Sequence, residues 1–172
     1  ELVDEAYNEL TDDPAASTMI PLVKAGKNVA AARTFSKIYG LAGMRVGYMI
    51  AKPELLEKVT QYGLGDYGLN QAGVAAAVAS YNDEAFLAFS KTKIIEAREM
   101  VSEAIRRNGL TALPSETNFM FVNLGSKNAE SFRAAMADRN VLIRGIYRDY
   151  NHWSRVSMGK LEDVQMYVDA LP

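Results

Sequence analysis

The sequence contains no cysteine, a single histidine and a single tryptophan among its 172 residues. The absence of cysteine excludes disulfides and thiolate metal sites. The lone histidine, His152, has no carboxylate beside it at a helical ligand spacing, so we expect no metal site. Apolar runs such as 73–79 are far shorter than the roughly 20 residues that cross a bilayer, so we expect no membrane partner.

Positive and negative charges nearly balance along the chain. There are 19 lysines and arginines against 21 acidic residues, which gives a formal net charge of −2, and the two signs are interspersed. A nucleic-acid partner is therefore not expected. With 49% apolar and 23% charged residues, the composition is typical of a soluble globular protein. The sequence shows no basic and apolar leader pattern, and we take the cytoplasm as the expected location.

The first residues are unusual for the start of a natural protein. There is no initiator methionine, and residues 1–7 (Glu-Leu-Val-Asp-Glu-Ala-Tyr) read as the end of a strand followed at once by polar residues. Natural proteins rarely begin inside a segment that carries function. We therefore expect a C-terminal portion of a longer protein.

Short apolar runs alternate with helical patterns along the chain. This alternation predicts α/β layers in the first half and a small α+β lobe in the second. The expected strands are 28–34, 46–51, 118–124, 141–146 and 155–158. The expected helices are 54–59, 71–81, 84–108, 129–139 and 161–171, with Asn70 and Asp83 as N-terminal caps and Gly109 as a stop. We place the domain boundary inside the longest helix, which gives domains 1–95 and 96–172.

One segment carries most of the chemistry, residues 33–48 with the sequence Arg-Thr-Phe-Ser-Lys-Ile-Tyr-Gly-Leu-Ala-Gly-Met-Arg-Val-Gly-Tyr. The amine of Lys37 can form an imine with an aldehyde. Thr34, Ser36 and Arg45 supply two hydroxyls and a guanidinium, which together can hold a phosphate. The Gly-Lys-Ser/Thr ending of a nucleotide-binding P-loop is missing. The segment therefore predicts a site for a ligand with both an aldehyde and a phosphate.

Other charged groups bear on the same prediction. Arg33 and Arg45, if they lie close to Lys37, would lower the pKa of its amine and favour imine formation. At the start of the chain, the carboxylate of Asp4 can keep a pyridine nitrogen protonated, and the hydroxyl of Tyr7 can donate a hydrogen bond to a phenolate. Taken alone, these two residues are better explained as a solvated acid and a half-buried tyrosine at a strand end.

The pattern Ser-Lys-x-x-Gly-x-x-Gly-x-Arg-x-Gly-Tyr resembles the cofactor-lysine signature of pyridoxal-phosphate-dependent aminotransferases of the aspartate-aminotransferase fold (fold type I, class I/II). Histidinol-phosphate aminotransferases are the most similar members. The resemblance implies an α/β fold: the C-terminal part of the large cofactor domain, a mixed sheet with flanking helices, and a small α+β C-terminal domain. It implies a Schiff base between Lys37 and pyridoxal 5'-phosphate. The other implied cofactor-binding residues are Asp4, Tyr7, Thr34, Ser36 and Arg45.

The resemblance also implies two substrate-binding arginines. Arg155 lies in Ser-Arg-Val-Ser-Met-Gly, which is similar to the family's Arg-Ile-Ser/Thr-x-Gly, whose arginine binds the α-carboxylate of the substrate. Arg144 lies near the position where histidinol-phosphate aminotransferases hold the substrate phosphate. Here Arg-Gly replaces the usual Arg-Asp, which argues against an imidazole-phosphate substrate.

The activity implied is transfer of an amino group between an amino acid or amino-alcohol phosphate and a 2-oxo acid, in a homodimer. Two alternatives remain open. A decarboxylase or lyase of the same fold uses the same lysine, aspartate and arginine. A non-catalytic fragment that binds no cofactor is the other alternative, since the family's ring-stacking aromatic and asparagine are not identifiable in this sequence.

Overall fold

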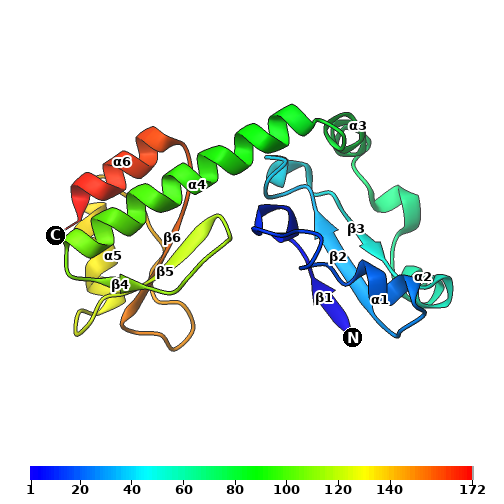
Figure 1. Cartoon of the computed structure of the whole chain (residues 1–172), viewed down its shortest axis with the longest axis horizontal. Helices are drawn as coiled ribbons and strands as arrows, with labels where there is room; N and C mark the ends of the chain where they lie inside the picture. Colours follow the sequence, from blue (N-terminus) through cyan, green and yellow to red (C-terminus); the bar gives the residue numbers. More distant parts are fainter. Residues whose placement is uncertain (172) are drawn as a thin grey trace. The chain divides into compact units, whose positions relative to one another are not determined.

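The structure is a computed structural model that describes the backbone of residues 1–171, in two compact units, Glu1–Ser90 and Lys91–Pro172. The longest helix, α4 (Glu84–Arg107), begins in the first unit and ends in the second (Figure 1). No helix in the described part of the chain is long and apolar enough to span a membrane.

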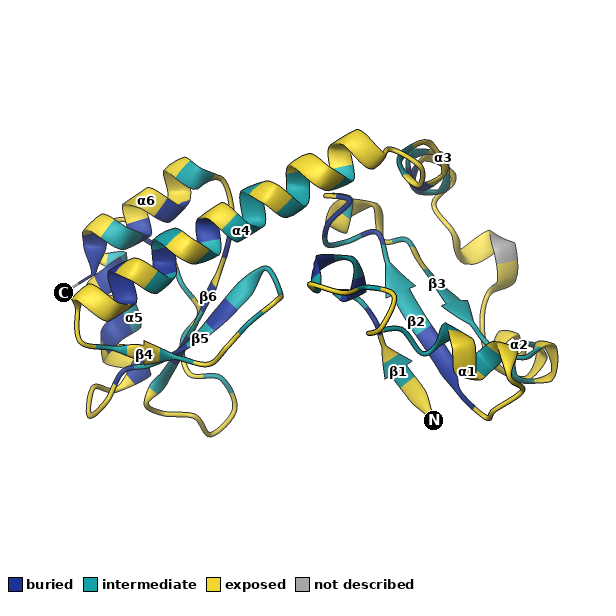
Figure 2. Cartoon of the chain, in the orientation of Figure 1, coloured by how far each residue is buried: buried dark blue, intermediate teal, exposed yellow. Residues whose placement is uncertain are grey.

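The first unit is built on a mixed sheet with the strand order β1-β2-β3. β1 (Leu2–Asp4) runs parallel to β2 (Ala30–Thr34), and β2 runs antiparallel to β3 (Gly47–Ile50). The start of β2 is buried (Figure 2). The helices of this unit are α1 (Ile20–Lys24), α2 (Pro53–Thr60), α3 (Gln71–Ser80) and the start of α4, with 3-10 turns at Asn8–Leu10, Ala42–Met44 and Gly65–Gly68.

The helix boundaries follow the capping signals of the sequence. The side chain of Asn70 accepts a hydrogen bond from the amide of Ala72 (3.1 Å) at the start of α3. Asp83 accepts from the amide of Phe86 (2.9 Å) at the start of α4. These bonds satisfy amides that have no partner within the helix. Gly109 follows α4 with φ of +67°, where a side chain would be strained.

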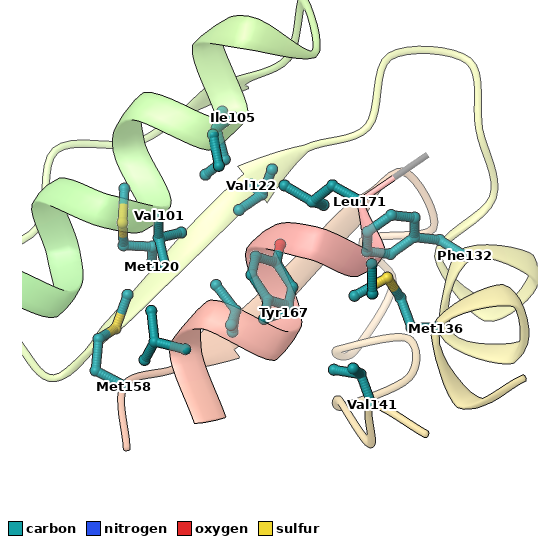
Figure 3. Packing of buried hydrophobic residues seen from close by; sticks show 14 of the residues in the cluster. Val101, Ile105, Met120, Val122, Phe132, Met136, Val141, Met158, Tyr167 and Leu171 are labelled. Carbon is teal, nitrogen blue, oxygen red and sulfur yellow. The ribbon is translucent and has the colours of Figure 1, made fainter. Parts of the chain in front are cut away.

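The second unit packs helices against one face of an antiparallel sheet with the order β4-β5-β6. The strands are β4 (Thr111–Ala112), β5 (Phe119–Asn123) and β6 (Trp153–Ser157), and the helices are α5 (Ala129–Ala137), α6 (Leu161–Ala170) and the end of α4. Alternate residues of β5 and β6 are buried, as expected when one sheet face is covered. Figure 3 shows that core, which includes Val101, Ile105, Met120, Val122, Phe132, Met136, Val141 and Tyr167.

The strand predicted over 141–146 is wrong. This segment is irregular and pairs with no strand among the described residues. Its opening apolar run, residues 141–143, is typical of a short buried strand, but Val141 is buried while Leu142 is 87% exposed. Asn140, immediately before it, adopts φ of +62°, which is incompatible with extended backbone.

Candidate active site

A cavity of about 420 Å³ lies in the first unit, where β1 and β2 end. It is lined by Leu2, Asp4, Ala6, Ala32, Arg33, Thr34, Ser36, Lys37 and Arg45. Asp4 is the last residue of β1 and Thr34 the last of β2, and the two strands are parallel. Ligands bind at the carboxyl ends of parallel strands in α/β sheets, and this volume is within the usual range for small-molecule sites.

Lys37 stands in a tight turn that follows β2. Its Nζ lies 5.0 Å from the centroid of the Tyr7 ring, so the structure brings these two predicted site residues together in a cation–π contact. The amide of Gly40 donates to the carbonyl of Lys37 (2.9 Å), and Gly40 has φ of +70°. Ile38, next to the lysine, is buried. The turn therefore holds the lysine backbone in place while its half-buried side chain reaches the cavity.

Ser36 and Arg45 form a small polar cup in the same cavity. Nη1 of Arg45 lies 3.5 Å from the hydroxyl of Ser36 and donates to the carbonyl of Ala42 (2.7 Å). The hydroxyl of Thr34 accepts from the amide of Ser36 (3.0 Å) and donates to the carbonyl of Val46 (3.4 Å). Hydroxyl and guanidinium groups donate hydrogen bonds to anionic oxygens, so this cup can bind a phosphate.

Arg45 has φ of +56° and ψ of +48°, a left-handed conformation that costs a non-glycine residue about 1–3 kcal/mol. The packing of α3 against the Ala42–Met44 turn helps to hold this conformation. An added Cβ at Gly73 of α3 would lie 2.8 Å from the carbonyl oxygen of Met44 and 2.9 Å from a methyl group of Val46. The close approach of this helix to the cup therefore requires glycine at position 73.

We expect Gly73→Ala to displace the turn that carries Arg45. Overpacking of this kind costs about 1–3 kcal/mol. Phosphate binding should weaken on the order of tenfold, which corresponds to about 1.4 kcal/mol. Titration of the chain with inorganic phosphate, followed by calorimetry, measures this. Gly63→Ala is the matched control, because a Cβ there meets only ordinary contacts at 3.6 Å or more. Equal phosphate affinity in the two variants would show that the helix does not set the cup.

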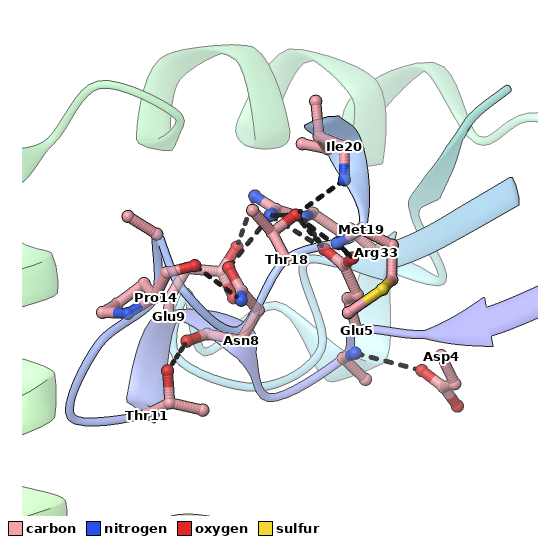
Figure 4. Close-up of polar contacts among 12 residues, drawn as sticks. Asp4, Glu5, Asn8, Glu9, Thr11, Pro14, Thr18, Met19, Ile20 and Arg33 are labelled. Atoms are coloured by element: carbon pink, nitrogen blue, oxygen red, sulfur yellow. Dashed lines mark hydrogen bonds and ion pairs between the residues drawn. The ribbon is translucent and has the colours of Figure 1, made fainter. Parts of the chain in front are cut away.

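Asp4 presents an exposed carboxylate to the cavity. Its Oδ1 accepts a hydrogen bond from the amide of Ala6 (3.0 Å), which closes a short turn before Tyr7 (Figure 4). The carboxylate keeps acceptor capacity beyond this single bond, because two oxygens provide about four acceptor positions. Asp4, Lys37 and the Ser36–Arg45 cup thus surround one cavity.

The main polar feature that the sequence did not predict lies beside this turn. The carboxylate of Glu5, 5% exposed, binds Nε and Nη2 of Arg33 at 3.0 and 2.9 Å. The sequence suggested that Arg33 lowers the pKa of the Lys37 amine. In the structure, its guanidinium is instead paired with the carboxylate of Glu5. Burial alone would raise the pKa of the Glu5 carboxyl, but hydrogen bonds from the Met19 amide, Arg33 and Thr18 hold that pKa below its usual value. The two residues are 28 positions apart, and no pattern in the sequence indicates that they pair.

In the second unit, Arg155 lies on the sheet face opposite the core. Its Cζ is 4.0 Å from the centroid of the Phe119 ring, and its cross-strand partner is Phe121. The Nε of Arg155 is buried and has no hydrogen-bond partner within the described residues. A buried donor without a partner is costly, and an anionic ligand would satisfy the guanidinium.

Arg144 and Arg148 both lie over Tyr147, with Cζ atoms 4.7 and 5.4 Å from its ring centroid. Gly145 stands where the resemblance leads one to expect aspartate. A Cβ at this position would lie 2.6 Å from Oε2 of Glu130, which is paired with Arg133. Both side chains are exposed and flexible, so a larger residue at position 145 would require this ion pair to shift.

The residues that line the cavity of the first unit suit a ligand with an aldehyde and a phosphate. The cavity offers one primary amine, a carboxylate on the far strand end, and a guanidinium–hydroxyl cup for the anion. Lys37 can attach to the aldehyde, Asp4 can bind a ring N–H, and Ser36 with Arg45 can bind the phosphate.

Fold and site together define a protein of the aminotransferase type, and the chain belongs to the aminotransferase class I and II family, whose model matches residues 2–171. The chain is 34% identical over 173 residues to a histidinol-phosphate aminotransferase of Gluconacetobacter diazotrophicus, covering 99% of this chain and 48% of that protein. These findings confirm the family resemblance and the α/β fold class.

Two solved structures are similar over the same span. A putative histidinol-phosphate aminotransferase from Erwinia carotovora atroseptica superposes with a TM-score of 0.92 at 37% identity, covering 98% of this chain and 48% of that one. The Sinorhizobium meliloti histidinol-phosphate aminotransferase, solved in complex with pyridoxal-5'-phosphate, gives 0.85 at 33% identity, covering 99% and 47%. The chain thus spans about half the length of the relatives it matches.

Proposed function

We propose that this chain is part of a pyridoxal-phosphate-dependent aminotransferase of the histidinol-phosphate type, with Lys37 as its catalytic residue. The observation that carries the proposal is the cavity at the ends of β1 and β2, which Asp4, Ser36, Lys37 and Arg45 all line. The family match and the pyridoxal-5'-phosphate bound to the Sinorhizobium meliloti enzyme support the choice of cofactor.

Each residue of the cavity has a distinct task in this proposal. The chemistry that pyridoxal phosphate supplies when bound is an electron sink for negative charge at the α-carbon of an amino acid. Asp4 keeps the ring nitrogen protonated, and Tyr7 donates to the phenolate oxygen. The phosphate is bound by Thr34, Ser36 and Arg45. The amine of Lys37 would hold the aldehyde carbon, and as a free amine it would accept and return the proton at the substrate's α-carbon.

Substrate recognition is assigned to the second unit. Arg155 binds the α-carboxylate, since its planar fork matches a carboxylate and its buried Nε has no other partner within the described residues. Arg144 binds a second anionic group of the substrate. The Arg-Gly sequence at Gly145 leaves the imidazole-phosphate substrate itself unsupported. The donor class is an amino acid, whose α-carboxylate Arg155 would bind, or an amino-alcohol phosphate, which has no such carboxylate; the acceptor is a 2-oxo acid.

The proposal also includes the domain bounds, the oligomeric state and the location that the sequence suggests. They are the domains 1–95 and 96–172, a homodimer and a cytoplasmic location. The alternative activity is decarboxylation or elimination on the same fold. Turnover that requires a 2-oxo acid acceptor supports transamination, whereas turnover without an acceptor supports the alternative.

Reductive trapping tests the central assignment. The chain is incubated with pyridoxal phosphate, reduced with borohydride and mapped by peptide mass spectrometry. We expect one labelled peptide, which contains Lys37, because only this lysine lines the described cavity. Label spread over several surface lysines, or no label on a chain shown to be folded, would contradict the proposal.

A further inference from the structure

A second polar cluster lies beside the cavity, centred on Arg33, whose backbone belongs to the same strand end. Successive residues of a strand point to opposite faces, so Asp4 and Glu5 diverge. On β2, Ala32 is the register partner of Asp4, and Arg33 follows it with the opposite orientation. The guanidinium of Arg33 and the carboxylate of Glu5 therefore meet beside the strand ends that bear the cavity.

The carboxylate of Glu5 is saturated with donors. It accepts from the amide of Met19 (2.6 Å), the hydroxyl of Thr18 (2.9 Å), and Nε and Nη2 of Arg33 (3.0 and 2.9 Å), as Figure 4 shows. The same Nη2 donates to Oδ1 of Asn8 (2.9 Å). One guanidinium thus connects β2 to both ends of the Glu5–Asn8 turn.

That turn contains the residues assigned to the cofactor ring. The amide of Asn8 donates to the carbonyl of Glu5 (3.1 Å), and the amide of Leu10 donates to the carbonyl of Tyr7 (2.9 Å). Tyr7 stands inside the turn, and Asp4 immediately precedes it. Any change in how Glu5 is bound moves these two side chains relative to Lys37, which follows β2.

We infer that the buried Glu5–Arg33 pair is a positioning device, which sets Asp4 and Tyr7 against the lysine through the turn that it holds. A buried ion pair adds little net stability, because the loss of hydration offsets the attraction between the charges. Its main effect is to select one arrangement of the segments that it joins. The inference rests on the proposed function, since it concerns the groups assigned to the ring of pyridoxal phosphate.

The inference predicts different effects on two affinities, that for pyridoxal phosphate and that for inorganic phosphate. The Ser36–Arg45 cup is held by other contacts, to Ala42 and Thr34. Weakening the pair should therefore reduce affinity for pyridoxal phosphate while leaving affinity for inorganic phosphate unchanged. A loss of general stability would reduce both.

The experiment compares Glu5→Gln and Arg33→Lys with Glu9→Gln. Glu9 is the matched control, because its Oε1 lies 3.6 Å from Nη1 of the same arginine. For the first two variants we expect about tenfold weaker binding of pyridoxal phosphate and about tenfold faster exchange of the Asn8 and Leu10 amides, the scale of one charge-assisted hydrogen bond. Phosphate affinity should stay within about twofold, and Glu9→Gln should resemble the native chain throughout.

Three results would overturn the inference: unchanged amide exchange at Asn8 and Leu10, equal losses for both ligands, or an equal effect of Glu9→Gln. If Glu5→Gln fails to fold, the same measurements on Arg33→Lys and Thr18→Val test the inference, since each of these variants removes one contact of the cluster. If the native chain binds no pyridoxal phosphate, the proposed function fails, while the amide exchange still tests whether the pair fixes the turn.

Discussion

A Lys37→Ala variant should lose the whole of the visible absorption band that pyridoxal phosphate gives with the native chain. Only a lysine amine can bind the aldehyde covalently here, and Lys37 is the lysine that lines the cavity among the described residues. The measurement is an absorption spectrum after addition of pyridoxal phosphate and removal of the excess. The fold should be retained, because the side chain of Lys37 is only half-buried and its turn is held by backbone hydrogen bonds.

Lys52→Ala is the matched control for this experiment. Lys52 is also half-buried but precedes α2, outside the cavity. It should keep the full band. A band of equal strength in Lys37→Ala would mean incidental reaction of surface lysines, and it would remove the central claim of the proposed function. No band in either sample, with a folded circular-dichroism spectrum, would contradict cofactor binding by this chain alone.

The largest expected effect on stability is that of Phe132→Ala in the second unit. Phe132 is 3% exposed and belongs to the core beneath the β4-β5-β6 sheet. Truncation of a buried phenylalanine costs about 3–5 kcal/mol, through lost burial and the cavity that remains. Urea unfolding followed by fluorescence measures it, because Trp153, the only tryptophan of the sequence, lies on β6.

Leu142→Ala tests the same unit from its surface. Leu142 is 87% exposed, so its truncation should change the free energy of unfolding by less than about 0.5 kcal/mol. Similar losses for the two variants would mean that the core is not organised as the structure shows. A loss for Leu142→Ala alone would show that the 141–146 segment is covered in solution.

Most elements of this fold were predictable because their signals are local. Asn70 and Asp83 cap helices by hydrogen bonds to amides two and three residues away. Gly109 ends α4 through its own backbone conformation. The 33–48 motif is also local, since Ser36 and Arg45 are only nine residues apart and their side chains lie close together. Because every residue of the motif lies in one short segment, its order and spacing are enough to indicate the family.

The short helix α1 was not predicted, and two further misses involve partners that are distant in sequence. Residues 141–146 open with an apolar run typical of a short strand, but no strand in the described chain pairs with them. β4 was not predicted because two residues, Thr111 and Ala112, carry almost no pattern without β5 beside them. Strand pairing depends on the register between two strands, and the sequence of one strand does not specify that register.

By itself the sequence determined the helices other than α1, the caps at Asn70 and Asp83, the cofactor-lysine motif and the family. Only the tertiary structure decided that Glu5 binds Arg33, and that Gly73 brings α3 against the turn that carries Arg45. The physical reason is the range of the interactions. Caps and turns are hydrogen bonds between near neighbours, whereas an ion pair across strands or a close helix contact exists only once packing has placed both partners.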